Sequence, residues 1–489
     1  MIQLTYKQRE NIGFQYIIDA LRPCSPYGQE LVRELQPFPK QQLPELKRQL
    51  ENVHQVLSCG EACKPNLLRL QRELMTLRMV RGTAKKCLEA PLNEIDLFEL
   101  KRFLLKTFEL RPLWAEVQEG LQLQGITIED TTAALDILDP QKNRVASFYL
   151  ADSSSPALSA IRKEKRALEE LLRKEPGSEE VLAKRGLVAA EEELEEGKIR
   201  EQLTLKLRPY IPAVLSNMEA LGDLDLTLEK ARLARTYGGI MPTITEDYLS
   251  MTDVINPKVS DLLKNQNKSF TPVSIELKPG ATVITGANMG GKSVALKTVA
   301  LNVLLVHYGF LPFGKEVSLP IFEGLHIISE DLESVDRGLS SFGGEMVRFN
   351  QVAKQLREGF SLVILDEFAR GTNPEEGSAI VQAVTQYLGE QKSLSLLATH
   401  YDKVASHAGA HYQVRGLRDM DMVTVEREIA GLNGEDSMAL IDRYMNYGLY
   451  RVEGAQDCPR DAVNICRLLG MDGAILDRVE KIYGETREN

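Results

Sequence analysis

Features that mark secreted and membrane proteins are missing from this chain of 489 residues. It has only six cysteines, scattered along the sequence, and this spacing predicts reduced thiols rather than a disulfide framework. No apolar run has the length of a membrane span, and the opening MIQLTYKQRENIG is too polar for a signal peptide. These absences predict a cytoplasmic protein with no membrane partner.

An excess of basic residues is also missing. The chain has 59 lysines and arginines against 70 aspartates and glutamates, which gives a formal net charge of -11. An acidic protein can still bind DNA if it concentrates its cations on one surface, so the charge disfavours nucleic acid without excluding it. The composition, 43% hydrophobic and 26% charged, is that of a globular protein. The length predicts about two to four domains.

The first part of the chain is expected to be helical. Residues 29–57 repeat leucine and valine at helical spacing, interrupted by three prolines, and we extend this expectation to residues 1–125. The pattern of residues 127–150 is more mixed. It predicts a short β-hairpin around Asp139 and Pro140.

Two long, highly charged helices are predicted between residues 156 and 207. They meet at the corner Pro176–Gly177, where Ser178 suits the N-cap of the second helix. The pattern fits a projecting antiparallel hairpin and equally two packed helices of a bundle. Acidic residues prevail in residues 175–201, and the basic run IRKEKR of the first arm is interpreted as a solvated helix face.

A phosphate-binding loop is the strongest motif. GANMGGKS matches GxxxxGK followed by serine, and it stands between the apolar strand TVIT and the helix VALKTVALNVLLV. Such glycines let backbone N–H groups face phosphates at a helix N-terminus. We expect Lys292 to reach the β- and γ-phosphates and the Ser293 hydroxyl to ligate Mg²⁺. The expected nucleotide-binding residues are Gly286, Ala287, Asn288, Met289, Gly290, Gly291, Lys292, Ser293 and Val294.

Two more strand ends carry polar side chains. The apolar run Ser361–Leu365 ends in Asp366 and Glu367, and such a pair lies beside the phosphate loop in a parallel sheet. Asp366 is expected to support Mg²⁺, and Glu367 to act as the general base on the attacking water. A third apolar strand runs into His400, which is placed to contact the γ-phosphate or that water. The expected catalytic side chains are therefore Lys292, Glu367 and His400.

These segments resemble the ATPase domain of the MutS family, ABC-type ATPases best known from DNA mismatch repair. The resemblance rests on TGANMGGKS, LDEFARGTN and ATHY. It implies ATP and Mg²⁺ as ligands and a homodimer or close heterodimer, because the partner's signature loop completes each site in this family. SSFGGEM resembles that loop, and we transfer its contact with the partner's nucleotide to Ser340, with Glu345 as a further candidate. Phe270 is either an adenine-stacking residue or an ordinary core residue.

The resemblance also implies the fold class, α plus α/β. We expect a helical core with a projecting helical hairpin, then a P-loop ABC-type ATPase domain with a mainly parallel sheet, then a C-terminal helical dimerisation segment. The core is expected in residues 1–127 and 223–244, the lever- or clamp-like hairpin in 128–222, the ATPase domain in 245–415 and the C-terminal extension in 416–489.

Three departures from the mismatch-repair proteins bear on function. The chain opens directly into the core without a Phe-x-Glu reading motif, ends without room for a nuclease-like domain, and has an acidic hairpin. It thus resembles a short branch of the family, the ATPase component that reactivates adenosylcobalamin-dependent lysine and ornithine aminomutases. Two functions fit the sequence. One is an ATPase that remodels a protein client such as an aminomutase, and the other is an ATPase that binds DNA structures or mismatches.

Overall fold

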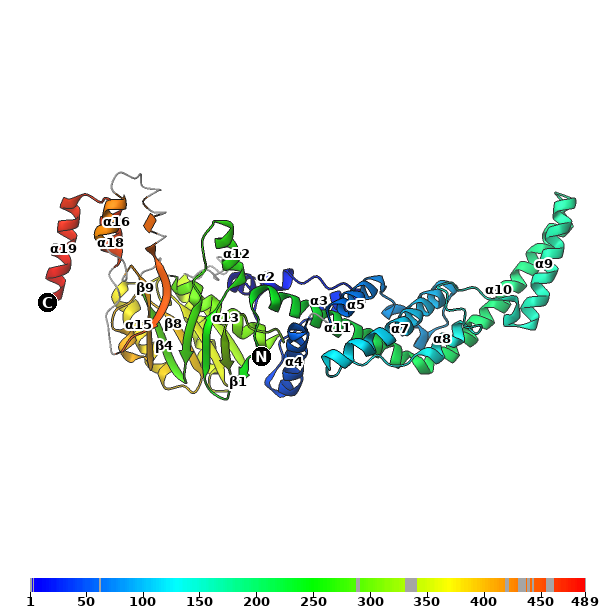
Figure 1. The fold of residues 1–489 in the computed structure, drawn as a ribbon, viewed down its shortest axis with the longest axis horizontal. Coiled ribbons are helices and arrows are strands. Elements are labelled where there is room, and N and C mark those ends of the chain that lie inside the picture. Colours follow the sequence, from blue (N-terminus) through cyan, green and yellow to red (C-terminus); the bar gives the residue numbers. More distant parts are fainter. Residues whose placement is uncertain are drawn as a thin grey trace. The chain divides into compact units, whose positions relative to one another are not determined.

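The computed structural model describes residues 2, 4–60, 63–286, 291–329, 341–417, 422–429, 437, 440–441, 444–453 and 461–488. The chain forms two compact units, whose elements are labelled in Figure 1. The first unit comprises Met1–Leu21, Gln36–Leu57 and Lys230–Asn489. The second comprises Arg22–Leu35 and Ser58–Glu229.

The second unit is helical throughout the part that the structure describes. Its long helix α7 begins with a capping box in which Asn93 and Asp96 exchange hydrogen bonds. The elements are α3 (Pro26–Arg33), α5 (Lys64–Thr76), α6 (Arg81–Glu89), α7 (Glu94–Leu121), α8 (Thr132–Leu138), η2 (Asp152–Ser154), α9 (Pro156–Lys174), α10 (Glu179–Leu207), η3 (Arg208–Tyr210) and most of α11 (Ile211–Tyr237).

The predicted β-hairpin around Asp139 and Pro140 is wrong. Helix α8 stands in its place and buries Ala134, Leu135 and Leu138, which recur at helical spacing. Asp139 ends this helix and pairs with the buried ammonium of Lys101 at 3.2 Å. A buried ion pair therefore fixes this corner of the chain, where the sequence pattern indicated only a turn.

The helical hairpin is confirmed as two long helices that lie side by side, α9 and α10 (Figure 1). Ser155 caps α9 by accepting a hydrogen bond from the Leu158 N–H. Ser178 stands at the N-cap of α10 as expected, but its side chain makes no capping bond. A short turn between the two arms makes them antiparallel.

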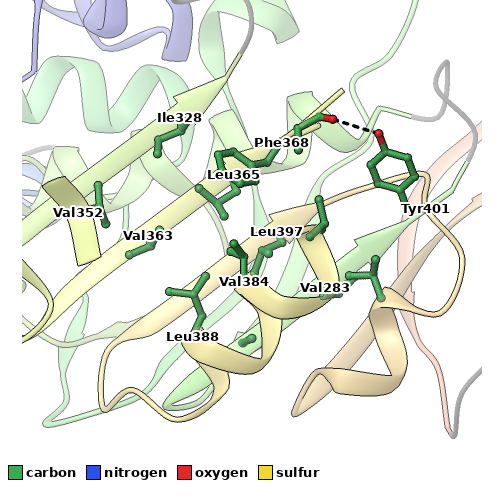
Figure 2. Close-up of a cluster of buried hydrophobic side chains, with 14 of the residues drawn as sticks. Val283, Ile328, Val352, Val363, Leu365, Phe368, Val384, Leu388, Leu397 and Tyr401 are labelled. Atoms are coloured by element: carbon green, nitrogen blue, oxygen red, sulfur yellow. Dashed lines mark hydrogen bonds between the residues drawn. The ribbon is translucent and has the colours of Figure 1, made fainter. Parts of the chain in front are cut away.

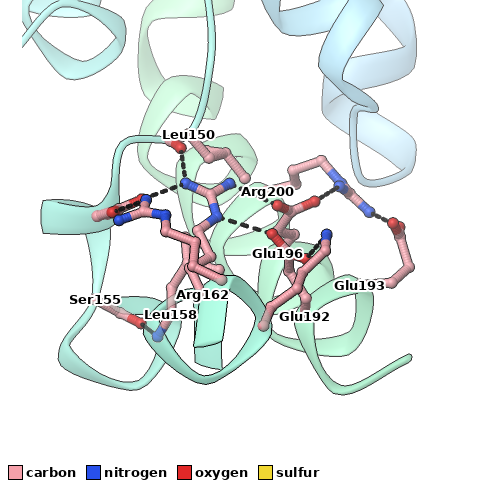
Figure 3. Close-up of polar contacts among 11 residues, drawn as sticks. Leu150, Ser155, Leu158, Arg162, Glu192, Glu193, Glu196 and Arg200 are labelled. Carbon is pink, nitrogen blue, oxygen red and sulfur yellow. Dashed lines mark hydrogen bonds and ion pairs between the residues drawn. The ribbon is translucent and has the colours of Figure 1, made fainter. Parts of the chain in front are cut away.

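An ion-pair network joins the two arms (Figure 3). The Arg162 guanidinium donates to Glu192 at 2.9 Å, to Glu196 at 2.7 Å and to Asp152 at 2.9 Å. Burial raises the pKa of Glu192, but hydrogen bonds from Lys165 and Arg162 outweigh this effect and the net pKa lies below its usual value. The basic run of the first arm is thus turned in part toward the acidic second arm, and only the rest of it, which includes Lys163 and Arg166, forms the predicted solvated face.

The first unit contains a six-stranded sheet, in the order β10-β9-β4-β8-β7-β6. All neighbours are parallel except β10 and β9, which confirms the mainly parallel sheet expected from the sequence. A second sheet has the order β1-β5-β2-β3. The strands are β1 (Thr243–Ile244), β2 (Leu249–Val254), β3 (Val273–Leu277), β4 (Gly280–Thr285), β5 (Glu316–Leu319), β6 (Gly324–Ser329), β7 (Ser361–Asp366), β8 (Leu394–Ala398), β9 (Ala410–Gly416) and β10 (Asn446–Arg451).

Helices accompany both sheets, which gives the α plus α/β class predicted for the chain. The sheet continues past residue 415, where we expected the ATPase domain to end, because β10 pairs with β9. The helices of this unit are α1 (Tyr6–Ile12), α2 (Phe14–Asp19), η1 (Lys40–Gln42), α4 (Leu43–Ser58), α12 (Pro257–Asn265), α13 (Lys292–His307), α14 (Ser341–Gln355), α15 (Pro374–Gly389), η6 (Val404–His407), α16 (Met422–Ile429), α18 (Asp461–Leu468) and α19 (Gly473–Glu488).

One face of the six-stranded sheet packs against α14 and α15 (Figure 2). Val363 and Leu365 of β7 point into this cluster, where they meet Val352 of α14 and Val384 of α15. Successive side chains of a strand point to opposite faces. The next residue, Asp366, therefore points to the other face, toward α13. This alternation decides which side chain at the end of β7 reaches the phosphate loop.

Among the described residues, no helix combines the length and the apolar character needed to cross a bilayer.

Candidate functional site

The phosphate loop joins β4 to α13, as the sequence predicts. Gly286 and Gly291 both have positive φ, 144° and 82°, which a residue with a side chain rarely adopts. Lys292 then opens α13, with Gly291 at its N-cap. The predicted contacts of Ala287, Asn288, Met289 and Gly290 lie outside the described residues. The glycines on both sides of them are in the conformation that a phosphate cradle requires.

Lys292 is almost completely buried, with 2% of its side chain exposed. Its ammonium donates a hydrogen bond of 2.7 Å to the Gly286 carbonyl and lies 3.8 Å from a carboxylate oxygen of Glu367. A buried cation is stable only when such partners offset its loss of hydration. The loop therefore holds the charge at the N-terminus of α13, where a phosphate would bind.

The two predicted Mg²⁺ ligands are in contact. The Ser293 hydroxyl donates to Asp366 Oδ1 at 2.9 Å. Ser293 belongs to the first turn of α13, and Asp366 ends β7 on the face that α13 covers. Mg²⁺ in nucleotide sites takes oxygen ligands from one or two such groups and the rest from phosphates and water. The donor set fits this ion.

Glu367 follows β7 in a left-handed conformation, with φ 50°. Its N–H donates to the Ala398 carbonyl of β8 at 3.0 Å, and its carboxylate accepts from Arg370 at 2.8 Å. With 13% of the side chain exposed, the carboxylate is shielded from solvent but still accessible. Glu367 thus lies next to Lys292, at the edge of the sheet where the parallel strands end.

His400 lies two residues beyond the end of β8. Burial lowers its pKa, an effect that Glu367 opposes and Lys292 reinforces, and this favours the neutral form of the imidazole. Its Nδ1 is buried and has no hydrogen-bond partner among the described residues. An imidazole at this strand end can form a hydrogen bond with a phosphate or a water molecule.

The remaining predicted site residues lie in different parts of the chain. Val294 lies in the first turn of α13, directly after Lys292 and Ser293. Phe270 is partly exposed between α12 and β3, and no described contact joins it to the phosphate loop, so its adenine-stacking role stays a prediction. Ser340 lies outside the described residues. Glu345 is 2% exposed and accepts a hydrogen bond from the Ala369 N–H of its own chain, and its contact with a partner's nucleotide stays a prediction.

Tyr447 is a neighbour of the phosphate loop that the sequence did not reveal. A Cβ on Gly291 would lie 3.0 Å from its ring, which shows how closely β10 approaches the N-cap of α13. Tyr447 comes after residues 416–445 of the predicted C-terminal extension, a segment that the sequence did not link to the phosphate loop. An aromatic residue in a short strand signal after that segment was the only available indication.

The comparisons with known proteins agree with this geometry. The family model described as MutS domain V matches residues 282–466. Endonuclease MutS2 of Thermomicrobium roseum is 30% identical over 408 residues, 78% of this chain and 48% of the relative. Endonuclease MutS2 of Caldicellulosiruptor saccharolyticus is 24% identical over 475 residues, 82% of this chain and 57% of the relative.

A third relative, Endonuclease MutS2 of Acetivibrio thermocellus, is 30% identical over 220 residues, 44% of this chain and 27% of the relative. The chain therefore spans only 27% to 57% of the length of these three relatives. The matched domain contains the phosphate loop, the carboxyl ends of strands β7 and β8, and Tyr447. Residues 282–466 of this chain therefore match MutS domain V, and the chain is similar to MutS2 proteins over 78% and 82% of its own length.

Proposed function

We propose that the protein binds ATP at the phosphate loop and hydrolyses it to ADP and phosphate. The contact between Ser293 and Asp366, beside the buried ammonium of Lys292, carries this proposal. These three groups come from α13 and β7, and they bring a cation and two oxygen ligands to one helix N-terminus. Mg²⁺ held there would neutralise charge on the phosphates.

Each remaining group has a separate task in the proposed reaction. Lys292 exchanges its bond to the Gly286 carbonyl for the β- and γ-phosphates. Glu367 accepts a proton from a water molecule while the oxygen of that water bonds to the γ-phosphorus and the bond to the ADP oxygen breaks. His400 orients the γ-phosphate or the water through its imidazole ring. The reaction needs no redox partner, and the carboxylate that takes the proton lies next to the phosphate loop.

We further propose that two copies assemble around the nucleotide, as the family resemblance implies through Ser340. The division into a helical core, a hairpin, an ATPase domain and a C-terminal dimerisation segment belongs to the same proposal. The helices α18 and α19 provide the helical C-terminal segment that it requires.

Purified protein is therefore expected to release phosphate from ATP only when Mg²⁺ is present, and to dimerise when a non-hydrolysable ATP analogue is added. Phosphate release and light-scattering mass, measured with Mg²⁺ and with excess chelator, check both expectations. Protein that binds Mg·ATP and stays monomeric at every concentration would contradict the proposed nucleotide site shared by two copies. Protein that does not bind Mg·ATP would contradict the proposed ATPase function as a whole.

The hairpin favours a protein client as the partner. Most of its cations, Arg162, Lys165, Arg166, Lys184, Arg185, Lys198 and Arg200, are already within ion-pair distance of its own carboxylates. They are consequently poorly placed to neutralise DNA phosphates. On α10, Leu187 and Leu194 are 69% and 68% exposed. Exposed leucines at helical spacing suit the apolar face of a protein partner.

We propose that nucleotide-driven closure remodels a protein client, and the resemblance points to an adenosylcobalamin-dependent aminomutase. DNA is the second candidate because the relatives carry the name endonuclease. A protein client predicts no steep salt dependence of duplex binding and no stimulation of ATPase by duplex DNA. Fluorescence anisotropy with a labelled duplex from low to physiological salt, together with ATPase assays with and without duplex, measures both. DNA-stimulated turnover or tight, steeply salt-dependent binding would favour DNA instead.

A further inference from the structure

The turn after β7 contains two residues in an uncommon backbone conformation. Glu367 and Ala369 have φ values of 50° and 61°, in the left-handed region that side chains disfavour. Such residues persist only where neighbouring groups determine the backbone firmly, and they are frequent at functional sites. This turn carries the proposed general base, so the groups that impose its conformation bear on the chemistry.

Two buried side chains form hydrogen bonds with the backbone of Ala369, one with its N–H and the other with its carbonyl. Glu345 of α14 accepts a hydrogen bond of 2.9 Å from the Ala369 N–H. The Tyr401 hydroxyl donates a bond of 3.2 Å to the Ala369 carbonyl, drawn as the dashed line in Figure 2. Both side chains are buried, with 2% of Glu345 and 9% of Tyr401 exposed. Neither group competes with bulk water for these bonds.

The residues around Ala369 leave space for these two hydrogen bonds. A Cβ on Gly377 would lie 2.4 Å from the Tyr401 hydroxyl oxygen and 2.8 Å from the Ala369 carbonyl oxygen, so only glycine leaves room for the bond between them. The ring of Phe349, one turn beyond Glu345 on α14, packs against Phe368 with ring centroids 5.5 Å apart. Helix α14 is thus docked on the turn by a ring contact and by a hydrogen bond.

We propose that Glu345 and Tyr401 are positioning residues for Glu367. By fixing Ala369, they set the direction of the turn that carries Glu367 at one side and its ion-pair partner Arg370 at the other. If Ala369 relaxed to an ordinary φ, the turn would reorient and the Glu367 carboxylate would leave its place beside Lys292. In this proposal Glu345 and Tyr401 act on Glu367 through Ala369. This inference rests on the proposed ATPase function.

The direct test is the steady-state kinetics of Glu345→Ala. We expect kcat to fall about tenfold to a hundredfold, because small displacements of a catalytic group have effects of this size, while KM for ATP stays within about twofold. Glu345→Gln should recover most of the activity, since its amide oxygen can still accept the Ala369 N–H. Asn350→Ala, an exposed change on the same helix, is the matched control. Unchanged kcat in Glu345→Ala would overturn the proposal.

A double variant separates positioning from a general structural effect. In a Glu367→Gln background, adding Glu345→Ala should lower kcat no further, because Glu345 acts through Glu367. An additional fall equal to that of the single variant would overturn the proposal. Tyr401→Phe, which removes one hydroxyl, repeats the test if Glu345→Ala does not fold. Full turnover by Glu367→Gln would refute the proposed base instead, so the two failures are distinguishable.

Discussion

Glu367→Gln is expected to bind ATP with unchanged affinity and to lose about a hundredfold to ten-thousandfold of its turnover, the usual contribution of a general base. The glutamine keeps the shape of the side chain and still accepts from Arg370, but it cannot take a proton from water. Lys292, Ser293 and Asp366 stay in place, so the nucleotide remains held. Phosphate release and the affinity for a fluorescent ATP analogue measure the two effects separately.

The same variant should also accumulate as a nucleotide-bound dimer, because hydrolysis no longer reopens the composite site. Light-scattering mass in the presence of Mg·ATP measures this accumulation. Glu375→Gln is the matched control, since Glu375 is an exposed carboxylate in the first turn of α15 and no described side-chain contact joins it to the site residues. Turnover by Glu367→Gln at the rate of this control would show that another group is the base.

The sequence sufficed for those parts of the site that depend on local pattern. A glycine-rich loop between an apolar strand and a helix is typical of a phosphate-binding loop, so the positions of Lys292 and Ser293 were predictable, while their roles stay predictions. Asp366 and Glu367 were predictable because an apolar run buried on both faces must be a strand whose polar end lies at the sheet edge. The contact of Ser293 with Asp366 bears out that argument.

Other parts required the tertiary structure. Glu345 stands in a motif that resembles a loop acting on a partner, but only the packing of α14 on the sheet shows that its carboxylate turns inward to Ala369. Arg162 belongs to a run of charges that reads as a solvated face, because nothing local indicates that acidic side chains about thirty residues later will meet it. Long-range pairing is not encoded in spacing along one helix.

Lys292→Met is expected to weaken ATP binding about a hundredfold or more. Loss of charge-assisted hydrogen bonds to phosphates costs about 3 kcal/mol, and each 1.4 kcal/mol is about a factor of ten in affinity. Methionine keeps the aliphatic length that the buried lysine fills, so the effect measures charge rather than a cavity. Isothermal titration with Mg·ATP measures the affinity, and thermal unfolding without nucleotide shows whether the fold is intact.

The nucleotide-free variant should be at least as stable as the natural chain, and this separates a binding role from a structural one. In the free protein the Lys292 ammonium is buried with 2% exposure, and its bond to Gly286 and its distance of 3.8 Å from Glu367 only offset the cost of burying the charge. Arg370 still pairs with Glu367 when Lys292 is replaced. Lys278→Met, at an exposed lysine 68% open to solvent, is the control. If Lys292→Met bound Mg·ATP as tightly as this control, the buried ammonium would be structural and the phosphates would have to bind elsewhere.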